Sequence, residues 1–537
     1  MKLRFIEPAN LPYRRSIQNL FVYDKYIRTP SNGLLTLATI ARRYVEDTKM
    51  YSESISKIPL KDLLDADIIF LSLFTFNANR GYRLADFLKK RSRALIVLGG
   101  LHPTLCPEEA ARHCHYVLTG EGDESIVDFI LAVRDKKPLD FPGLAFFKDG
   151  KFISTGRRQP PADIDVIPDR SLLYRFQAMA GHNTIWPQVH ASRGCPHCCD
   201  YCALVAAFGR GVRTRSPENV VEDIRQAIAF FDQGHHRLAK VLWITDDNFF
   251  ANRAWAIQVL NAIIASGIRY QFTIQARFEV GFDDEMLELL KKAGFIELAM
   301  GIEFLEDESF KAYHKESTYR QILKSVRNIR RHGLRVRGLF IVGADNHTVG
   351  VGKRLARFVI ENHISGVLIQ SMYFIPGTPV YETHKDRLIG APAGQPSKCT
   401  PDWSRCTGKV VHYPEKLSPA QLQREIIDAS RRIYSLPRLA DALIHQRGID
   451  RLLFLGEFFW QAWVRRQLKS ELAWLSSLPA SESRMVSSPC IRPERSSLRS
   501  SSYPRPKRWW QRRILSPGRT FPSFWKTPGF SWITSAL

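Results

Sequence analysis

Two patterns of apolar and polar positions alternate along the first 130 residues. Unbroken apolar runs such as residues 66–74 are typical of parallel strands that are covered on both faces. The segments between them, such as residues 80–91, place apolar side chains at helical spacing. This alternation predicts a doubly wound, Rossmann-like α/β domain over residues 1–135.

Three loops of this domain are predicted to meet at the carboxyl edge of its sheet, where such folds bind ligands. They span residues 75–80, 99–104 and 119–124, and two of them are rich in glycine. Glycines there would let the backbone approach a flat or phosphorylated ligand closely, although a purely structural role explains them equally well.

Residues 136–185 have little regular pattern and several prolines, so we expect a linker. From residue 186 the alternation resumes, with six strand signals and five helical segments between them. A parallel, partial (β/α)6 TIM-type barrel over residues 186–385 fits this pattern better than an open sheet does. In such folds the chemistry gathers at the carboxyl ends of the strands.

Helical patterns dominate residues 386–470, and residues 452–464 are the most apolar stretch there. That stretch is too short to span a bilayer and contains Glu457, so we favour a core helix over one at a membrane interface. Residues 471–537 are rich in Ser, Arg and Pro, with eleven Lys or Arg against three Glu. We expect a disordered basic tail.

Charge and composition narrow the classes of protein that fit. The 537 residues carry a formal net charge of +24, which suits anionic partners, but a solvated basic surface is the better explanation than nucleic-acid binding. Peripheral contact with a membrane stays open. With no secretory signal at its start and nine cysteines that do not form a disulfide framework, the chain is expected in the reducing cytoplasm.

Four of the nine cysteines fall within "SRGCPHCCDYC", residues 192–202, directly after the first barrel strand. A structural zinc site would need four ligands, and no second cysteine pair is convincing. A disulfide is disfavoured in a reducing compartment. The remaining interpretation is an iron–sulfur cluster held by Cys195, Cys199 and Cys202, since thiolates are the ligands that such clusters use. Three ligands on a four-iron cluster leave one iron open to substrate.

This C-x3-C-x2-C motif, with Tyr201 before its last cysteine, resembles that of the radical S-adenosylmethionine (SAM) enzymes. The resemblance implies a 4Fe-4S cluster whose open iron chelates SAM, and one-electron cleavage of SAM to a 5′-deoxyadenosyl radical. Cys198 matches no ligand position and is expected to be a packed small residue. The rival interpretation makes Cys198 a shifted ligand.

Later strand ends resemble the SAM-binding positions of the same family. By this resemblance Asp246, Asp247 and Asn248 would face the methionine amino group, although a helix cap by Asp247 or Asn248 is the rival interpretation. The other expected SAM contacts lie at the ends of later strands: Arg277 and Glu303 near the carboxylate and ribose, and Gly338 and Gly343 along the adenine.

The N-terminal domain resembles the cobalamin (B12)-binding domain of one branch of that family. "GGLHPTLCPEEA" and "YVLTGEGDES" are similar to its GG-x-HPT and GEGE motifs. His102 could ligate cobalt, but it more plausibly shapes its loop. The residues expected at cobalamin are Thr75, Gly99, Gly100, His102, Gly120, Glu121 and Gly122.

That branch implies a cobalamin-dependent methyltransferase that methylates an unactivated carbon of a small-molecule, lipid or tetrapyrrole substrate, with a reductant such as flavodoxin or ferredoxin. A cyclase or oxidoreductase of the anaerobic Mg-protoporphyrin monomethyl ester cyclase type is the enzymatic alternative. An iron–sulfur electron carrier is the non-enzymatic one. No motif in the sequence identifies the substrate.

Overall fold

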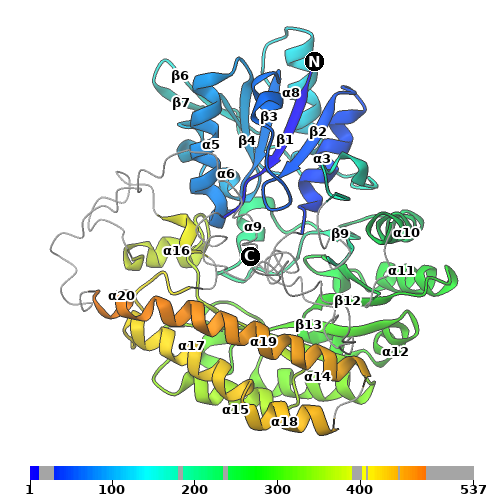
Figure 1. Ribbon diagram of the computed structural model, residues 1–537, viewed down its shortest axis with the longest axis vertical. Helices are drawn as coiled ribbons and strands as arrows, with labels where there is room; N and C mark the ends of the chain where they lie inside the picture. Colours follow the sequence, from blue (N-terminus) through cyan, green and yellow to red (C-terminus); the bar gives the residue numbers. More distant parts are fainter. Residues whose placement is uncertain are drawn as a thin grey trace, which may run out of the picture.

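The computed structural model describes residues 1–10, 29–178, 185–233, 240–389, 402–406, 409–445 and 448–478. An N-terminal α/β domain lies above a second α/β domain, and long C-terminal helices run along the second domain on the side away from the first (Figure 1). This arrangement confirms the fold class expected from the sequence.

The N-terminal domain is built on a seven-stranded sheet with strand order β2-β1-β3-β4-β5-β6-β7. Its first five strands are parallel and, as predicted, nearly continuous in apolar residues, because helices cover both faces. The strands are β1 (Leu3–Glu7), β2 (Thr48–Ser52), β3 (Ile68–Ser72), β4 (Leu95–Gly99), β5 (Tyr116–Leu118), β6 (Leu144–Lys148) and β7 (Lys151–Ser154).

Two groups of helices enclose this sheet. One face packs against α3 and α8, and the other against α5 and α7. The helices of the domain are α3 (Asn32–Arg42), α4 (Leu60–Leu64), α5 (Ala78–Arg91), α6 (Leu101–Leu105), α7 (Pro107–Ala111) and α8 (Asp123–Arg134).

The segment 136–185, expected to be an irregular linker, differs from that expectation in its first half. Strands β6 and β7 form an antiparallel hairpin that extends the N-terminal sheet through β5. The turn between them, Asp149–Gly150, has positive φ at both residues, as a tight hairpin requires. The strand signal was missed because this edge hairpin is only half buried and lacks a long apolar run.

The second domain is a six-stranded, fully parallel sheet with strand order β15-β14-β13-β12-β11-β8, as the six strand signals predicted. Its strands are β8 (Gln188–Val189), β11 (Val241–Ile244), β12 (Gln271–Ala276), β13 (Phe295–Glu303), β14 (Arg335–Val342) and β15 (Gly366–Ser371). A short ribbon of β9 (Ser192–Arg193) and β10 (Arg213–Thr214) follows β8 and flanks α9 (Ala203–Phe208).

Helices on the outside of the barrel connect these strands (Figure 1). They are α10 (Pro217–Asp232), α11 (Arg253–Ala265), α12 (Asp284–Lys292), α13 (Asp307–Ala312), α14 (Tyr319–Arg331), α15 (Val351–Glu361) and, after the last strand, α16 (Pro379–His384). Several begin at a side chain that accepts a backbone N–H, such as Ser216 before α10 and Thr318 before α14.

The C-terminal helices are α17 (Pro419–Ile433), α18 (Leu436–His445), α19 (Gly448–Ser470) and α20 (Leu472–Ser476). The apolar stretch 452–464 lies inside α19, where Phe454 and Trp460 are buried, so the core-helix interpretation is confirmed. No helix in the described part of the chain is long and apolar enough to cross a membrane. Most of the expected basic tail, residues 479–537, lies outside the described residues.

Candidate active site

One cavity of about 640 Å³ joins the two α/β domains. Its upper wall comes from the carboxyl edge of the N-terminal sheet, including Phe74, Gly99 and Gly100. Its lower wall comes from the cysteine loop and from the inward-facing side chains of the barrel strands. Both regions in which the sequence placed chemistry therefore open into the same space.

Cys195, Cys199 and Cys202 all line this cavity, whereas Cys198 does not. None of the four is in a disulfide. A tetrahedral zinc ion with bonds of about 2.3 Å would hold its thiolates about 3.8 Å apart. In the described part of the chain the three sulfur atoms are not all within 4.8 Å of one another. Their wider spacing fits a cluster of several iron atoms better than a single ion.

Polar side chains approach two of these sulfur atoms. Nδ2 of Asn248 lies 3.8 Å from Sγ of Cys195, and Nη1 of Arg277 lies 3.9 Å from Sγ of Cys199. Burial raises the pKa of Cys195, and it raises the pKa of Cys202 to about 11. Thiols of this kind need a metal to become thiolates at neutral pH, because coordination removes the proton.

Three of the expected SAM residues reach the cavity: Asp247, Arg277 and Glu303. Asp247 accepts a hydrogen bond of 2.9 Å from N of Gly194, which fixes its carboxylate next to the cysteine loop. Glu303 ends β13 with a φ of 65°, an unusual backbone conformation for a non-glycine residue, and it points its side chain into the cavity.

Lys315 also lines the cavity and was missed by the sequence reasoning. It is only 5% exposed, donates a hydrogen bond of 2.6 Å to O of Gly301, and lies 3.5 Å from Oε1 of Glu303. Burial lowers its pKa, and the Glu303 carboxylate opposes that effect. A lysine three residues after the end of a short helix carries no sequence signal of burial, so its burial is seen only in the fold.

Asp246 and Asn248 do not line the cavity. The carboxylate of Asp246 is buried and accepts hydrogen bonds from N of Ala191, at 2.7 Å, and from Oγ of Ser192, at 2.6 Å. Asp246 therefore fixes the chain that leads into the cysteine loop rather than facing a ligand. Asn248 makes no side-chain cap, so the helix-cap interpretation fails for it.

Gly338 and Gly343 also lie off the cavity. A Cβ at Gly338 would lie 2.4 Å from the ring of Phe340, and a Cβ at Gly343 would lie 2.9 Å from the side chain of Leu422 on α17. Both glycines leave room for neighbouring protein side chains, and their expected place along the adenine stays a prediction.

Five of the seven residues expected at cobalamin line the cavity: Gly99, Gly100, Gly120, Glu121 and Gly122. Gly100 has a φ of 94°, and a Cβ there would lie 2.9 Å from N of Leu73, so a side chain is excluded. At Gly120 a Cβ would meet nothing within 4 Å, which leaves this edge open to a ligand.

Thr75 and His102 are buried away from the cavity. Nε2 of His102 lies 3.3 Å from Oε1 of Glu109, which also accepts a hydrogen bond of 3.0 Å from Trp403. His102 therefore shapes its loop and contacts the segment 402–406, as the sequence reasoning favoured over cobalt ligation. Cys106 completes a group with His102 and Glu109 whose polar atoms lie within 4.8 Å of one another.

A cluster of ion pairs connects the two domains at the cavity, and it was also missed. Arg193 of the barrel donates hydrogen bonds of 2.9 Å to Glu121 and to Asp123 of the N-terminal domain. Arg213 pairs with the same Glu121. Sequence reasoning assigned Glu121 to cobalamin, whereas its carboxylate is held by two arginines.

Two protein-family models match the two domains whose residues line the cavity. The radical SAM superfamily model matches residues 189–359, and the B12-binding domain model matches residues 28–130. The chain is a member of the radical SAM superfamily with an N-terminal B12-binding domain. These domains imply a 4Fe-4S cluster, SAM and cobalamin, and the three cysteines and the open glycine edge provide suitable sites for them.

Two known methyltransferases are similar in sequence to this radical SAM protein over about half or more of its length. It is 24% identical over 424 residues to bacteriochlorophyllide d C-12(1)-methyltransferase of Chlorobaculum tepidum, covering 78% of this chain and 86% of that one. It is 25% identical to hopanoid C-2 methylase of Rhodopseudomonas palustris, covering 52% of this chain and 54% of that one.

Among solved structures, the methyltransferase TsrM from Kitasatospora setae, with cobalamin and a [4Fe-4S] cluster bound, aligns with a TM-score of 0.64. The alignment covers 88% of this chain and all of that one at 14% identity, so the similarity is one of fold.

Proposed function

We propose that this protein is a cobalamin-dependent radical SAM methyltransferase that adds a methyl group to an unactivated carbon of a small molecule. The observation that carries the proposal is the shared cavity. Cys195, Cys199 and Cys202 line one side of it, and Gly99, Gly100 and the 120–122 loop line the other. A substrate between them would be within reach of both cofactors.

When bound, the cluster supplies the electron that cleaves SAM, and cobalamin supplies the methyl group. The residues of the chain bind and orient. The ammonium of Lys315 suits the SAM carboxylate, and the carboxylate of Asp247 suits its amino group. Glu303, held beside Lys315, is placed to accept hydrogen bonds from ribose hydroxyls.

Arg277 holds the opposite side of the same pocket. Its guanidinium is hydrogen-bonded to Glu279 and lies beside Cys199. A fixed positive charge there favours the anionic form of the cysteine and of any cluster bound to it. The apolar side chains of Leu339, Ile341 and Leu368 line the barrel interior and help to exclude water from a reactive radical.

The substrate is not identified by these residues, and the two methyltransferase relatives act on different molecules, a bacteriochlorophyllide and a hopanoid. We infer a small molecule, since the cavity of about 640 Å³ lies between the domains, and a one-electron donor such as flavodoxin or ferredoxin. The free cysteines at the site are consistent with placement in a reducing cytoplasm.

The test is anaerobic reconstitution with iron and sulfide, followed by SAM and dithionite, with and without hydroxocobalamin. A cobalamin-dependent methyltransferase forms 5′-deoxyadenosine and, with an accepted substrate, S-adenosylhomocysteine in equal amount. Methyl-deuterated SAM and mass spectrometry on tetrapyrrole and hopanoid acceptors detect the transferred group. A cyclase would form 5′-deoxyadenosine without stoichiometric S-adenosylhomocysteine, and an electron carrier would form neither.

A further inference from the structure

Three buried polar side-chain atoms without hydrogen-bond partners belong to residues that line the cavity where the domains meet. They are Oγ1 of Thr29, Nδ2 of Asn32 and Nε2 of Gln188. Thr29 and Gln188 are each only 6% exposed. Buried polar groups without partners are rare, because each costs free energy in the folded protein. Three of them on one cavity indicate a bound group that the polypeptide does not supply.

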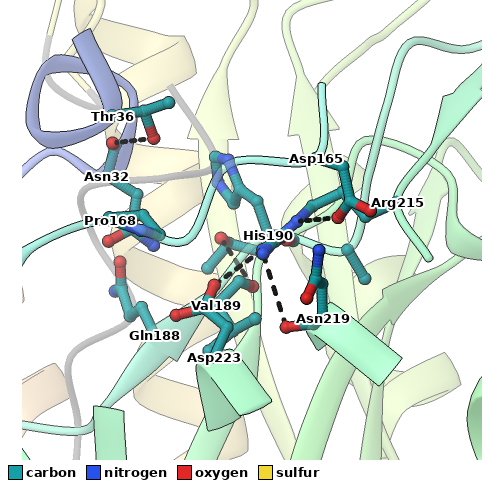
Figure 2. Close-up of polar contacts among 12 residues, drawn as sticks. Asn32, Thr36, Asp165, Pro168, Gln188, Val189, His190, Arg215, Asn219 and Asp223 are labelled. Atoms are coloured by element: carbon teal, nitrogen blue, oxygen red, sulfur yellow. Dashed lines mark hydrogen bonds and ion pairs between the residues drawn. The ribbon is translucent and has the colours of Figure 1, made fainter. Parts of the chain in front are cut away.

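The three donors come from both domains. Thr29 precedes α3 and Asn32 begins it, inside the segment that matches the B12-binding domain. Gln188 lies on β8, the first strand of the barrel, and His190 follows two residues later on the same cavity wall. In Figure 2, Asn32 and Gln188 lie on the same side of β8, with the imidazole of His190 beside them.

A buried ion-pair network holds β8 in this position. Arg215 donates hydrogen bonds to O of His190 and to Asp223 (Figure 2). Arg170 donates to O of Gln188 and to the same Asp223. Both ends of this two-residue strand are therefore fixed before any ligand binds. Gln188, the one of the three residues on β8, therefore projects from a backbone that is already fixed.

The chemistry of the three atoms selects the ligand. The amide nitrogens of Asn32 and Gln188 donate hydrogen bonds, and the Thr29 hydroxyl can donate as well as accept, so together they suit a ligand that carries acceptors such as carbonyl oxygens. The rim of a corrin ring carries acetamide and propionamide groups, whose carbonyl oxygens radiate in several directions. The ammonium, carboxylate and ribose of SAM already have suitable partners at the cysteine end of the cavity, in Asp247, Lys315 and Glu303.

We propose that Thr29, Asn32 and Gln188 bind amide groups at the rim of cobalamin, so that barrel strand β8 forms part of the cobalamin site. The inference rests on the proposed function, because it requires cobalamin in this cavity. His190 extends the same surface. Burial, with the nearby Arg193 and Arg215, lowers its pKa to about 4, so the imidazole is neutral at pH 7 and can donate or accept.

The first test measures hydroxocobalamin affinity of the full chain by equilibrium dialysis with absorbance detection. Gln188→Leu and Asn32→Leu are each expected to weaken binding about three- to tenfold, the usual range for one net hydrogen bond. The matched control is Gln226→Leu. Gln226 is exposed on α10 and does not line the cavity. It should leave cobalamin affinity unchanged.

A second measurement separates binding from misfolding. Without cobalamin, Gln188→Leu should unfold at the same temperature as wild type or higher, since it removes a buried donor without a partner. With saturating hydroxocobalamin, its rise in melting temperature should be smaller than that of wild type. A variant that is destabilised without cobalamin would show that Gln188 is structural and would overturn the inference.

A third measurement identifies the amide. The probes are cobalamin derivatives in which one propionamide is hydrolysed to a carboxylate. Wild type should bind one of these derivatives more weakly than it binds cobalamin. Gln188→Leu should bind that derivative and cobalamin equally well. If wild type and both variants bind all derivatives equally, the inference is wrong while cobalamin binding stands. If Gln188→Leu alters only the KM of the methyl acceptor, the donors serve substrate and the inference is wrong. If wild type binds no hydroxocobalamin, the proposed function fails as well.

Discussion

Nη1 of Arg193, two residues before the first cluster cysteine, donates a hydrogen bond of 2.9 Å to Oε2 of Glu121 in the B12-binding domain. Glu121 also pairs with Arg213, and Arg193 also pairs with Asp123. The loop that begins the cluster motif is thereby connected to the loop that borders the expected cobalamin edge. We therefore expect this cluster of charges to help set the distance between the two cofactors when both are bound.

Removing the shared carboxylate should uncouple the two cofactors. Glu121→Gln leaves Arg193 and Arg213 with a weaker partner, so we expect the free energy of unfolding to fall by about 2 kcal/mol. This loss is smaller than that on breaking a fully buried ion pair, because the Arg193 side chain is 22% exposed. The ratio of 5′-deoxyadenosine formed to methyl groups transferred should also rise several-fold. Glu124→Gln, which changes an exposed acid in the first turn of α8, is the control. An unchanged ratio in Glu121→Gln would show that the ion cluster does not set the spacing.

The cysteine assignment has its own sharp test. Cys195→Ala, Cys199→Ala and Cys202→Ala should each abolish 5′-deoxyadenosine formation and the electron paramagnetic resonance signal of the reduced cluster. Cys198→Ala, the matched control on the same loop, should retain both, because Cys198 does not line the cavity. Loss of the cluster in Cys198→Ala alone would mean that the ligand set is shifted by one position.

Lys315 offers a test of SAM binding that the sequence did not suggest. Lys315→Met removes the buried ammonium beside Glu303, so the KM for SAM should rise at least tenfold. The cluster signal recorded without SAM should stay unchanged. Lys311→Met, on the exposed face of α13, should leave the KM unaltered. A normal KM in Lys315→Met would assign the SAM carboxylate to another group.

Sequence patterning predicted the fold well because burial dictates it. The continuous apolar run at residues 66–74 became the central strand β3, and the six barrel strands appeared where the apolar segments stood. The edge hairpin β6–β7 was missed because its residues are half buried and its pattern is weak. The periodicity of apolar residues in a sequence follows their burial. Edge strands are only partly buried, so their pattern is weak.

The site was predictable only where the chemistry depends on local spacing. The cysteines of one loop must lie together, and Asp247 follows a strand end that faces the same cavity. Asp246, one residue earlier, alternates to the opposite side and bonds Ser192, which the doublet of aspartates did not reveal. Lys315 and Gln188 reach the cavity only through tertiary packing, and a single sequence carries no signal of such contacts.

Glu457 shows how an acid in an apolar helix can be structural. It is 3% exposed on α19, and its Oε2 lies 3.2 Å from Nη1 of Arg337 on β14, which also pairs with Glu297. Glu457→Ala should destabilise the protein by about 2–3 kcal/mol in urea unfolding, because part of the buried Arg337 charge loses its partner. Glu361→Ala, an exposed acid on α15, should change stability by less than about 0.5 kcal/mol. Equal effects of the two substitutions would contradict a role for Glu457 in attaching α19 to the barrel.

Glu7, at the carboxyl end of β1, predicts a specific dependence of stability on pH. Burial raises its pKa to about 7, and the nearby Ser52 hydroxyl and the hydrogen bond from N of Ser31 only partly oppose that shift. An unfolded glutamate has a pKa of about 4.3, so between about pH 4.3 and 7 the folded state retains a proton that the unfolded state releases. The contribution of Glu7 to stability is therefore fully present below about pH 4.3 and is lost as the pH rises to 7.

Glu7→Gln cannot ionise, so its stability relative to wild type should increase from pH 5 to pH 8, by about 1–3 kcal/mol in urea unfolding of the apoprotein. Glu46→Gln, at an exposed acid, should show a constant difference over the same range. If the difference for Glu7→Gln is also constant, its carboxyl is ionised in the folded protein throughout, and a cation must reach it.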